Sequence, residues 1–194
     1  MIDPLAKIWQ TPPDLGADPV VRTAQYFRAM RDLAVKADWI ALAETNPQPL
    51  LALTWIGQNI HRINQRLDDL LRDLLTCFNP NQRPQVQVFA APIAPRARVD
   101  GFCNFSIQPI TLIIDPSRIL AADWLYLVAH ELAHGVVATA GHGPLFHQAM
   151  VHLCLAHDLP LPPPDCLETG VLKYWPPYRA NPQADEFWLG AAGS

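Results

Sequence analysis

The order and spacing of three histidines and one glutamate constrain this chain more than any other feature of its sequence. His130, Glu131 and His134 form the pattern H-E-x-x-H, and His142 follows in a Gly-His-Gly-Pro segment. On a helix, residues four apart lie on one face, about 40° apart around the axis and roughly 6 Å apart along it. Both imidazoles can therefore bind one Zn²⁺, while the glutamate can reach a water on that metal without ligating it. The pattern predicts the site of a zinc hydrolase.

The residues around the pattern favour an amphipathic helix that ends just before His142. Apolar side chains recur on the face opposite the histidines, at Leu125, Val128, Leu132 and Val136. Asp123 is a suitable N-cap for this helix, Gly141 is expected to end it, and Pro144 is expected to open the next one. His142 would then lie in the turn between two helices, free to fold back toward the metal.

A catalytic zinc site needs three protein ligands and one open position. His130, His134 and His142 supply three, so none of the four cysteines is needed. A purely structural zinc site normally has four ligands, mostly cysteines. The motif also occurs by chance, but a chance match would not usually be followed by a third histidine in a turn. The three histidines are therefore the predicted metal ligands, and Glu131 is the predicted general base.

The same segment resembles the SprT-like (Spartan-type) family of zinc metalloproteases. In that family HExxH is followed, after a variable spacer, by HGPxF or HGxxW at the start of the next helix. The matching residues here are His130, Glu131, His134, His142, Gly143, Pro144 and Phe146. The preceding segment GFCNFSIQPITLIIDPSRI is similar to the family's strand region, so the resemblance covers roughly residues 84–157. It implies a zincin-like core and a protein or peptide substrate.

The chain also departs from related patterns. Many SprT-like proteins carry a C-terminal zinc ribbon with paired CxxC motifs, and this sequence contains no CxxC. The DNA-binding and ubiquitin-binding extensions of eukaryotic members are not recognisable either. The metzincin pattern does not fit, because its glycine and third histidine would fall at Val137 and Ala140.

Composition limits the partners and the compartment that we expect. Half of the 194 residues are hydrophobic and 16% are charged, which is sufficient for a substantial core. The net charge of −4 gives no general attraction to polyanions, so nucleic-acid binding is not supported. Four scattered cysteines in apolar runs predict free thiols in a reducing compartment. Neither a signal peptide nor a transmembrane run is recognisable, so we expect a cytoplasmic protein without a membrane partner, and no feature predicts its oligomeric state.

Two helices are expected before the first strand. The first begins at Asp18-Pro19 and should run to about Glu44, and the second should span about residues 50–78. The second carries apolar residues in 4-3-4-3-4 order, at Ile56, Ile60, Ile63, Leu67, Leu70 and Leu74. We expect an antiparallel hairpin packed on the core, although so long an apolar stripe could also bind a partner or a second copy.

The hydrophobic period changes after Pro80. Residues 86–90 alternate like a strand with one buried face, and 102–107 and 110–115 are further strand-like runs. The exposed edge of such a sheet can hold an extended peptide by main-chain hydrogen bonds, but the sequence does not indicate which strand forms that edge. A last helix, from Pro144 to about His157, should direct apolar side chains inward, at Leu145, Phe146, Ala149, Met150 and Leu153.

Together these patterns predict one compact α+β domain. Residues 1–80 would form an N-terminal tail and helical hairpin packed on the core. Residues 81–158 would form the zincin-like core, with a small antiparallel or mixed sheet beside the H-E-x-x-H helix. Residues 159–194 would form a proline- and aromatic-rich arm that lies over the domain.

The predicted function is that of a zinc-dependent metallopeptidase. Zn²⁺ would activate a water, and Glu131 would accept its proton. The resulting oxyanion needs a further hydrogen-bond donor, for which His147, Tyr174 and Tyr178 are candidates. The alternative is a zinc-binding scaffold or interaction protein that has a protease-like fold and no significant proteolytic activity.

Overall fold

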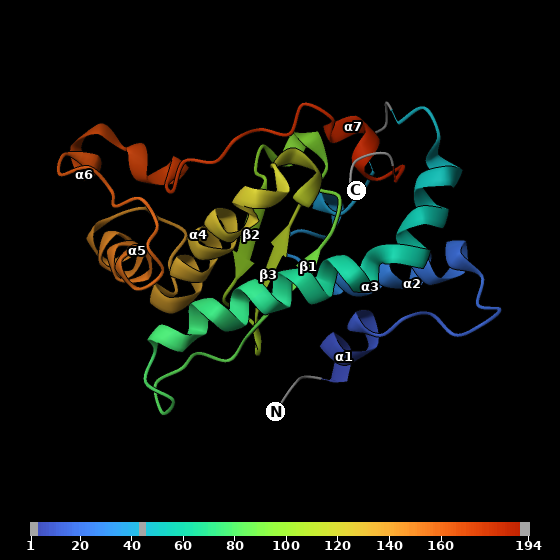
Figure 1. Ribbon diagram of the computed structural model, residues 1–194, viewed down its shortest axis with the longest axis horizontal. Helices are drawn as coiled ribbons and strands as arrows, with labels where there is room; N and C mark the ends of the chain where they lie inside the picture. Colours follow the sequence, from blue (N-terminus) through green and yellow to red (C-terminus); the bar gives the residue numbers. More distant parts are fainter. Residues whose placement is uncertain (1–3, 43–45, 191–194) are drawn as a thin grey trace.

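A small mixed β-sheet lies at the centre of the computed structural model, which describes residues 4–42 and 46–190 (Figure 1). Its strands are β1 (Val86–Ala90), β2 (Gly101–Asn104) and β3 (Ile110–Ile114), in the order β1-β3-β2. The central strand β3 pairs in parallel with β1 and antiparallel with β2. Most other elements are helices. The predicted α+β class with a small mixed sheet is therefore confirmed.

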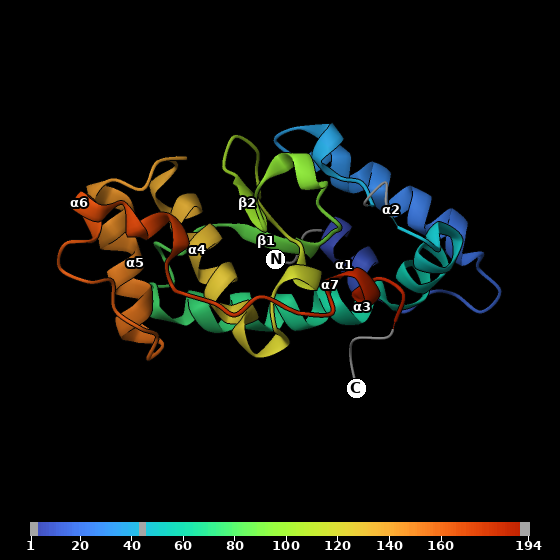
Figure 2. The same ribbon diagram turned by 90° about the horizontal axis from the view of Figure 1, so that it is seen from above.

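Strand β1 is buried on both faces, whereas its alternating sequence predicted one buried face. On one face, Gln87 and Phe89 are 5% and 0% exposed. On the other face, Val88 and Ala90 are buried to the same degree. Helix α3 (Pro49–Leu74) packs against this strand (Figure 2). The Gln87 amide nitrogen donates a hydrogen bond to the Thr111 hydroxyl at 3.0 Å, whereas the amide oxygen is buried without a partner among the described residues.

Helix α2 (Pro19–Leu33) begins where the sequence predicted. The Asp18 carboxylate accepts hydrogen bonds from the backbone N–H groups of Val20 at 2.8 Å and Val21 at 3.2 Å. An acidic N-cap followed by proline at the first helical position is therefore sufficient to start this helix.

The end of α2 was predicted wrongly, because the helix stops at Leu33 and does not continue toward Glu44. A short 3₁₀ helix (Ala37–Trp39) follows, and the fully buried Ile40 after it forms an antiparallel bridge with Ile93. The Asn104 amide donates to the Leu33 carbonyl at 2.9 Å and so satisfies the helix end. Burial of Ile40 outweighs helical periodicity here. Residues 43–45 of the predicted range lie outside the described residues.

Helix α3 carries the predicted apolar stripe, and a short 3₁₀ turn (Leu75–Cys77) follows it. Leu70 is half-buried, and the other residues of this stripe are buried. Helices α2 and α3 pack on each other, and at Gly57 their backbones approach very closely. A Cβ atom at Gly57 would lie 2.0 Å from the Pro19 carbonyl oxygen, so this contact requires glycine.

Buried side chains close the outer edge of β1. The Ala90 N–H donates to the Asn64 amide oxygen at 2.9 Å, and the Ala90 carbonyl accepts from the Tyr26 hydroxyl at 2.5 Å. The Asn64 amide also donates to the carbonyl of Trp9 in α1 (Pro4–Gln10) at 3.1 Å. Backbone groups of an edge strand are otherwise available to another chain, so the outer edge of β1 is occupied from within at Ala90.

Helix α4 (Trp124–Val137) contains the H-E-x-x-H motif and is buried over most of its length. Two details were predicted wrongly: Val136 is 37% exposed, and the helix ends at Ala138, which has left-handed geometry (φ 49°), not at Gly141. Asp123 stands at the N-cap, but its side chain does not cap the helix and binds Arg179 instead.

Helix α5 (Pro144–Ala156) opens with Pro144 as predicted. Its inward face holds Phe146, Met150 and Leu153, all fully buried. Leu145 was expected inward but is 62% exposed, because the opening turn of α5 directs Phe146, the next residue, into the core.

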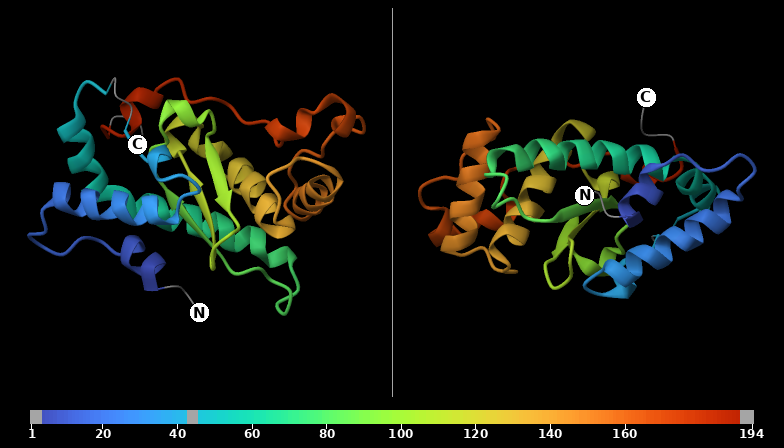
Figure 3. Two further views of the ribbon diagram at one scale, coloured as in Figure 1. Left: turned by 180° about the vertical axis from the view of Figure 1, so that it is seen from behind. Right: turned by 90° about the horizontal axis from the view of Figure 1, so that it is seen from below.

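The C-terminal segment runs back across the molecule from α6 (Cys166–Thr169) to α7 (Ala184–Phe187) (Figures 1 and 3). Asp123 accepts three hydrogen bonds from Arg179, one from its backbone N–H and two from its guanidinium, at 2.7–2.9 Å. The Asn181 amide donates to the Ser117 carbonyl at 2.8 Å. Phe187 and Trp188 are buried beyond these contacts. This segment therefore packs along the core as an anchored arm.

All four cysteines are free thiols, and three of them are buried. Among the described residues, no helix is both long enough and apolar enough to cross a membrane.

Candidate metal centre and cleft

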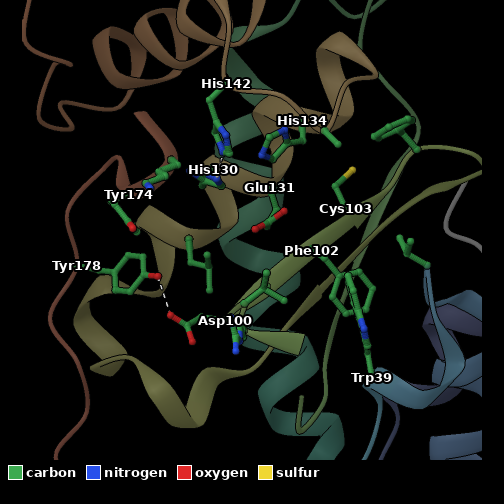
Figure 4. Close-up of a pocket in the computed structure, with 18 residues that line it drawn as sticks. Trp39, Asp100, Phe102, Cys103, His130, Glu131, His134, His142, Tyr174 and Tyr178 are labelled. Carbon is green, nitrogen blue, oxygen red and sulfur yellow. Dashed lines mark hydrogen bonds between the residues drawn. The ribbon is translucent and has the colours of Figure 1, made fainter. Parts of the chain in front are cut away.

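Three histidine side chains converge at one point of the structure. His130 and His134 come from α4, and His142 comes from the link between α4 and α5 (Figure 4). One ring nitrogen of each can be chosen so that all three lie within 4.8 Å of one another. The Nε2 atoms of His130 and His142 are 3.2 Å apart. The structure thus brings together the three residues that the sequence predicted as ligands.

Phe146 lies against this histidine cluster. Its ring centroid is 5.0 Å from that of His130, 4.5 Å from that of His134 and 4.8 Å from that of His142. The phenyl ring is fully buried. It therefore restricts the rotamers of all three imidazoles, which gives a physical role to the phenylalanine of the HGPxF segment.

Two imidazoles are oriented by backbone carbonyls on their far sides. His130 Nδ1 lies 2.7 Å from the Trp175 carbonyl, and His134 Nδ1 lies 2.7 Å from the Thr139 carbonyl. A carbonyl can only accept, so each Nδ1 carries the proton and each Nε2 presents a lone pair. Metal-bound histidines commonly have this second contact.

Burial keeps these histidines neutral. Desolvation lowers the pKa of His130 to about 3 and the pKa of His134 to about 4. Burial, followed by the charge of Lys173, also lowers the pKa of His142. Neutral imidazole is the form that ligates metals.

This arrangement fits a divalent cation. His130 and His134 present Nε2 lone pairs to a common point, and His142 Nε2 lies 3.2 Å from His130 Nε2, where it can donate a proton or, in its other tautomer, present a lone pair to a cation. Imidazoles suit zinc, copper, iron and nickel. The donor set therefore indicates a metal site but does not choose among these metals.

Glu131 lies next to the cluster and is buried, with 5% of its surface exposed. Desolvation raises the pKa of its carboxyl group to about 8, and the negative charge of Asp100 adds to this effect. Gly101 of β2 leaves room for this side chain, since a Cβ there would lie 3.3 Å from Glu131 Oε1. The carboxylate therefore has a high proton affinity and a confined position.

A cavity of about 500 Å³ opens beside these residues. The three histidines, Glu131, the β2 strand, the segment after α2 and the C-terminal arm all contribute to its wall (Figure 4). Tyr174 and Tyr178 line it, and the Tyr178 hydroxyl donates to Asp100 at 2.8 Å. His147, the third candidate for oxyanion stabilisation, is not among the lining residues.

Strand β2 presents its free edge to this cavity. The Asp100 carbonyl accepts from the Asp115 N–H at 2.8 Å, and the register pairs Phe102 with Ile113. Successive residues of an antiparallel strand direct their N–H and C=O groups to opposite sides. Gly101 and Cys103 therefore direct theirs away from β3, toward the cavity. No residue of β1 lines this cavity, so β2 supplies the strand edge beside the histidines.

Several features of this site were not predicted from the sequence. The carbonyls of Trp175 and Thr139 could not be recognised, because any residue type can supply a backbone carbonyl. Asp100 and Trp39 reach the cavity only through the tertiary fold. Gly101 stands in the strand-like segment GFCNFSI, where an isolated glycine is a signal of close approach by another group.

No protein-family model, characterised protein or solved structure was found to match this chain.

Proposed function

We propose that this protein is a zinc-dependent metallopeptidase of the SprT-like type. The observation that carries the proposal is the convergence of three neutral histidines beside a buried glutamate, in a cleft bordered by a free strand edge. Any one of these features occurs in proteins without hydrolytic activity. Their combination supplies ligands, a proton acceptor and a place for an extended chain.

His130, His134 and His142 would hold the metal through nitrogen atoms, with His130 and His134 using Nε2. A bound Zn²⁺ supplies Lewis acidity: it lowers the pKa of water toward 7 and polarises a carbonyl group. The carbonyls of Trp175 and Thr139 keep the two α4 imidazoles in their ligating orientation and tautomer.

Glu131 would act as the general base. Its carboxylate would take a proton from the attacking water and pass it to the nitrogen of the leaving amine. Burial favours proton uptake by this group, and the positive charge of a nearby cation would lower its pKa again toward the working range. Gly101 leaves the space in which the carboxylate can make this transfer.

The free edge of β2 supports a peptide as substrate. Gly101 and Cys103 can exchange main-chain hydrogen bonds with an extended peptide, which places its backbone alongside Glu131. Tyr174 and Tyr178 are the two predicted oxyanion donors that line the cavity, but the Tyr178 hydroxyl donates to Asp100. Tyr174 is therefore the proposed donor to the developing oxyanion.

Metal analysis combined with three substitutions tests this proposal. Purified wild type should contain about one zinc per chain, and His142→Ala should lose it. His152→Ala is the matched control, since His152 is an exposed histidine of α5 outside the cluster and should leave the zinc content unchanged.

Glu131→Gln should retain zinc and thermal stability but lose roughly 10²–10⁴-fold in the rate of casein digestion. The glutamine keeps the size of the side chain but cannot accept a proton. Equal digestion by wild type and Glu131→Gln would assign the activity to a contaminant or another site. A protein that holds zinc and digests no unfolded substrate would instead be the zinc-binding scaffold.

A further inference from the structure

The cavity beside the histidines has one apolar side. Val35, Trp39, Phe102 and Phe105 line it there. The rings of Trp39 and Phe102 meet edge to face, with centroids 5.2 Å apart. Asp100 and Tyr178 lie on the other side of Glu131 (Figure 4). The acidic side and the aromatic side of the cleft thus lie on opposite sides of Glu131.

Phe102 belongs to the strand whose edge is free. Its neighbours Gly101 and Cys103 direct their main-chain groups into the cleft, and its own groups pair with β3. In a peptide added antiparallel to β2, the residue opposite Phe102 would form the pair without hydrogen bonds. Side chains are closest in such pairs, with Cα atoms about 4.5 Å apart. That residue's side chain would lie on the same face of the sheet as Phe102 and Trp39.

Phe102 is also level with the proposed catalytic group. Gly101 is against Glu131, since a Cβ there would be 3.3 Å from the carboxylate oxygen. Cys103 Sγ lies 3.4 Å from where a Cβ of Gly135 would stand, one turn further along α4. The backbone of Phe102 therefore runs beside the part of α4 that holds Glu131 and His134. The substrate residue opposite Phe102 would adjoin the bond that these residues attack.

We propose that Val35, Trp39, Phe102 and Phe105 form a specificity subsite for a large apolar side chain, preferably aromatic, on one of the two residues joined by the cleaved bond. This inference rests on the proposed peptidase function. Val35 is 51% exposed. An apolar substrate side chain bound against it would therefore remove from water both its own apolar surface and that of Val35. A basic side chain would be disfavoured there, because the Lys36 ammonium already lies over the Trp39 ring, 5.5 Å from its centroid, and Arg98 lines the same cavity.

Mapping cleavage sites by mass spectrometry tests the preference in the intact protein. Wild type should digest a mixture of unfolded peptides with Phe, Tyr, Trp, Leu or Met enriched at one position that flanks the cleaved bond. Cleavage without enrichment at either flanking position, or enrichment of charged residues there, would refute the subsite.

Two substitutions locate the preference. Trp39→Ala should lower kcat/KM for a phenylalanine-containing peptide about 10- to 100-fold. For the same peptide with alanine in place of that phenylalanine, kcat/KM should change much less. Val35→Asp alters an exposed residue, so it should fold normally, and it should shift the preference toward Lys and Arg. Trp55→Ala is the matched control, because Trp55 is also a half-buried tryptophan but does not line the cavity. An unchanged preference in both test variants would refute the assignment.

Peptide binding separates this inference from the proposed catalysis. The probes are capped alanine–serine heptapeptides with Phe, Gly or Asp at the centre, titrated into the full-length Glu131→Gln protein by calorimetry. The phenylalanine peptide should bind about 10-fold or more tightly than the other two, and Val35→Asp in the same background should remove the difference. Equal affinities would refute the subsite even if wild type digests casein. A clear difference without digestion would uphold the subsite and reject the peptidase.

Discussion

Asn64 is the residue whose replacement most directly tests the closure of the β1 edge. It is fully buried on α3, where its amide oxygen accepts from the Ala90 N–H at 2.9 Å and its amide nitrogen donates to the Trp9 carbonyl at 3.1 Å. Asn64→Leu keeps a side chain of similar size but leaves the Ala90 N–H and the Trp9 carbonyl without their hydrogen-bond partner. Each buried polar group left without a partner costs about 1–3 kcal/mol.

Two such groups predict a loss of about 2–6 kcal/mol in the free energy of unfolding. The apolar leucine offsets part of this, so we expect the lower half of that range. A domain of this kind has about 5–15 kcal/mol of stability, so the effect is large. Urea unfolding, followed by circular dichroism in the presence of a chelator, measures it without a contribution from bound metal.

Gln58→Leu is the control, because Gln58 is exposed on the same helix and should change stability by no more than about 0.5 kcal/mol. Tyr26→Phe should have an intermediate effect, since it removes only the hydroxyl that donates to the Ala90 carbonyl. If Asn64→Leu unfolds at the same urea concentration as wild type, the network does not close this edge. The backbone of Ala90 would then be open to pairing with another chain, as the backbone of β2 is.

Two further predictions concern the packing of α2 and of the C-terminal arm. Replacing a helix-interior glycine with alanine usually stabilises a helix by up to about 1 kcal/mol, but Gly57→Ala should destabilise this protein by about 1–3 kcal/mol or more, because the added Cβ would overlap the Pro19 carbonyl. A higher urea midpoint for that variant would contradict this. The hydrogen bonds from Arg179 lower the pKa of Asp123, so this pair stabilises the fold above the unfolded pKa of about 3.9 and the contribution disappears as pH falls through the lower folded value. Asp123→Asn should therefore reduce stability at pH 7 and differ least from wild type at the acidic end of a pH series. The control Asp185→Asn removes an exposed carboxylate and should match the stability of wild type throughout. A stability difference for Asp123→Asn that is the same at every pH would refute the ion pair.

Local sequence patterns determined the elements that carry the candidate site. The spacing of His130 and His134 predicts one helical face, and the helix is present. Pro144 after a turn predicts a new helix, so the link that carries His142 was also predictable. These predictions succeed because helix starts and helix faces depend on residues within a few positions of one another.

Predictions failed where distant contacts compete with local preference. The periodic apolar residues after Leu33 favour a longer α2, but Ile40 is buried by pairing with Ile93. Asp123 has the residue type and the position of an N-cap, yet its carboxylate binds the guanidinium of Arg179. In each case a partner far away in the sequence offers burial or charge pairing that the local interaction does not.

The sequence by itself determined which side chains are available for chemistry: two imidazoles and one carboxylate at helical spacing, and a third imidazole in the turn that follows the helix. Only the tertiary structure decided their environment. It placed the carbonyls of Trp175 and Thr139 behind two imidazoles, buried Glu131 next to Gly101, and left the β2 edge facing the cleft. Backbone carbonyls carry no residue identity, and burial and strand edges arise from segments far apart along the chain. For these physical reasons, local patterns predicted none of these environments in full, and the isolated Gly101 signalled only that some group approaches the strand there.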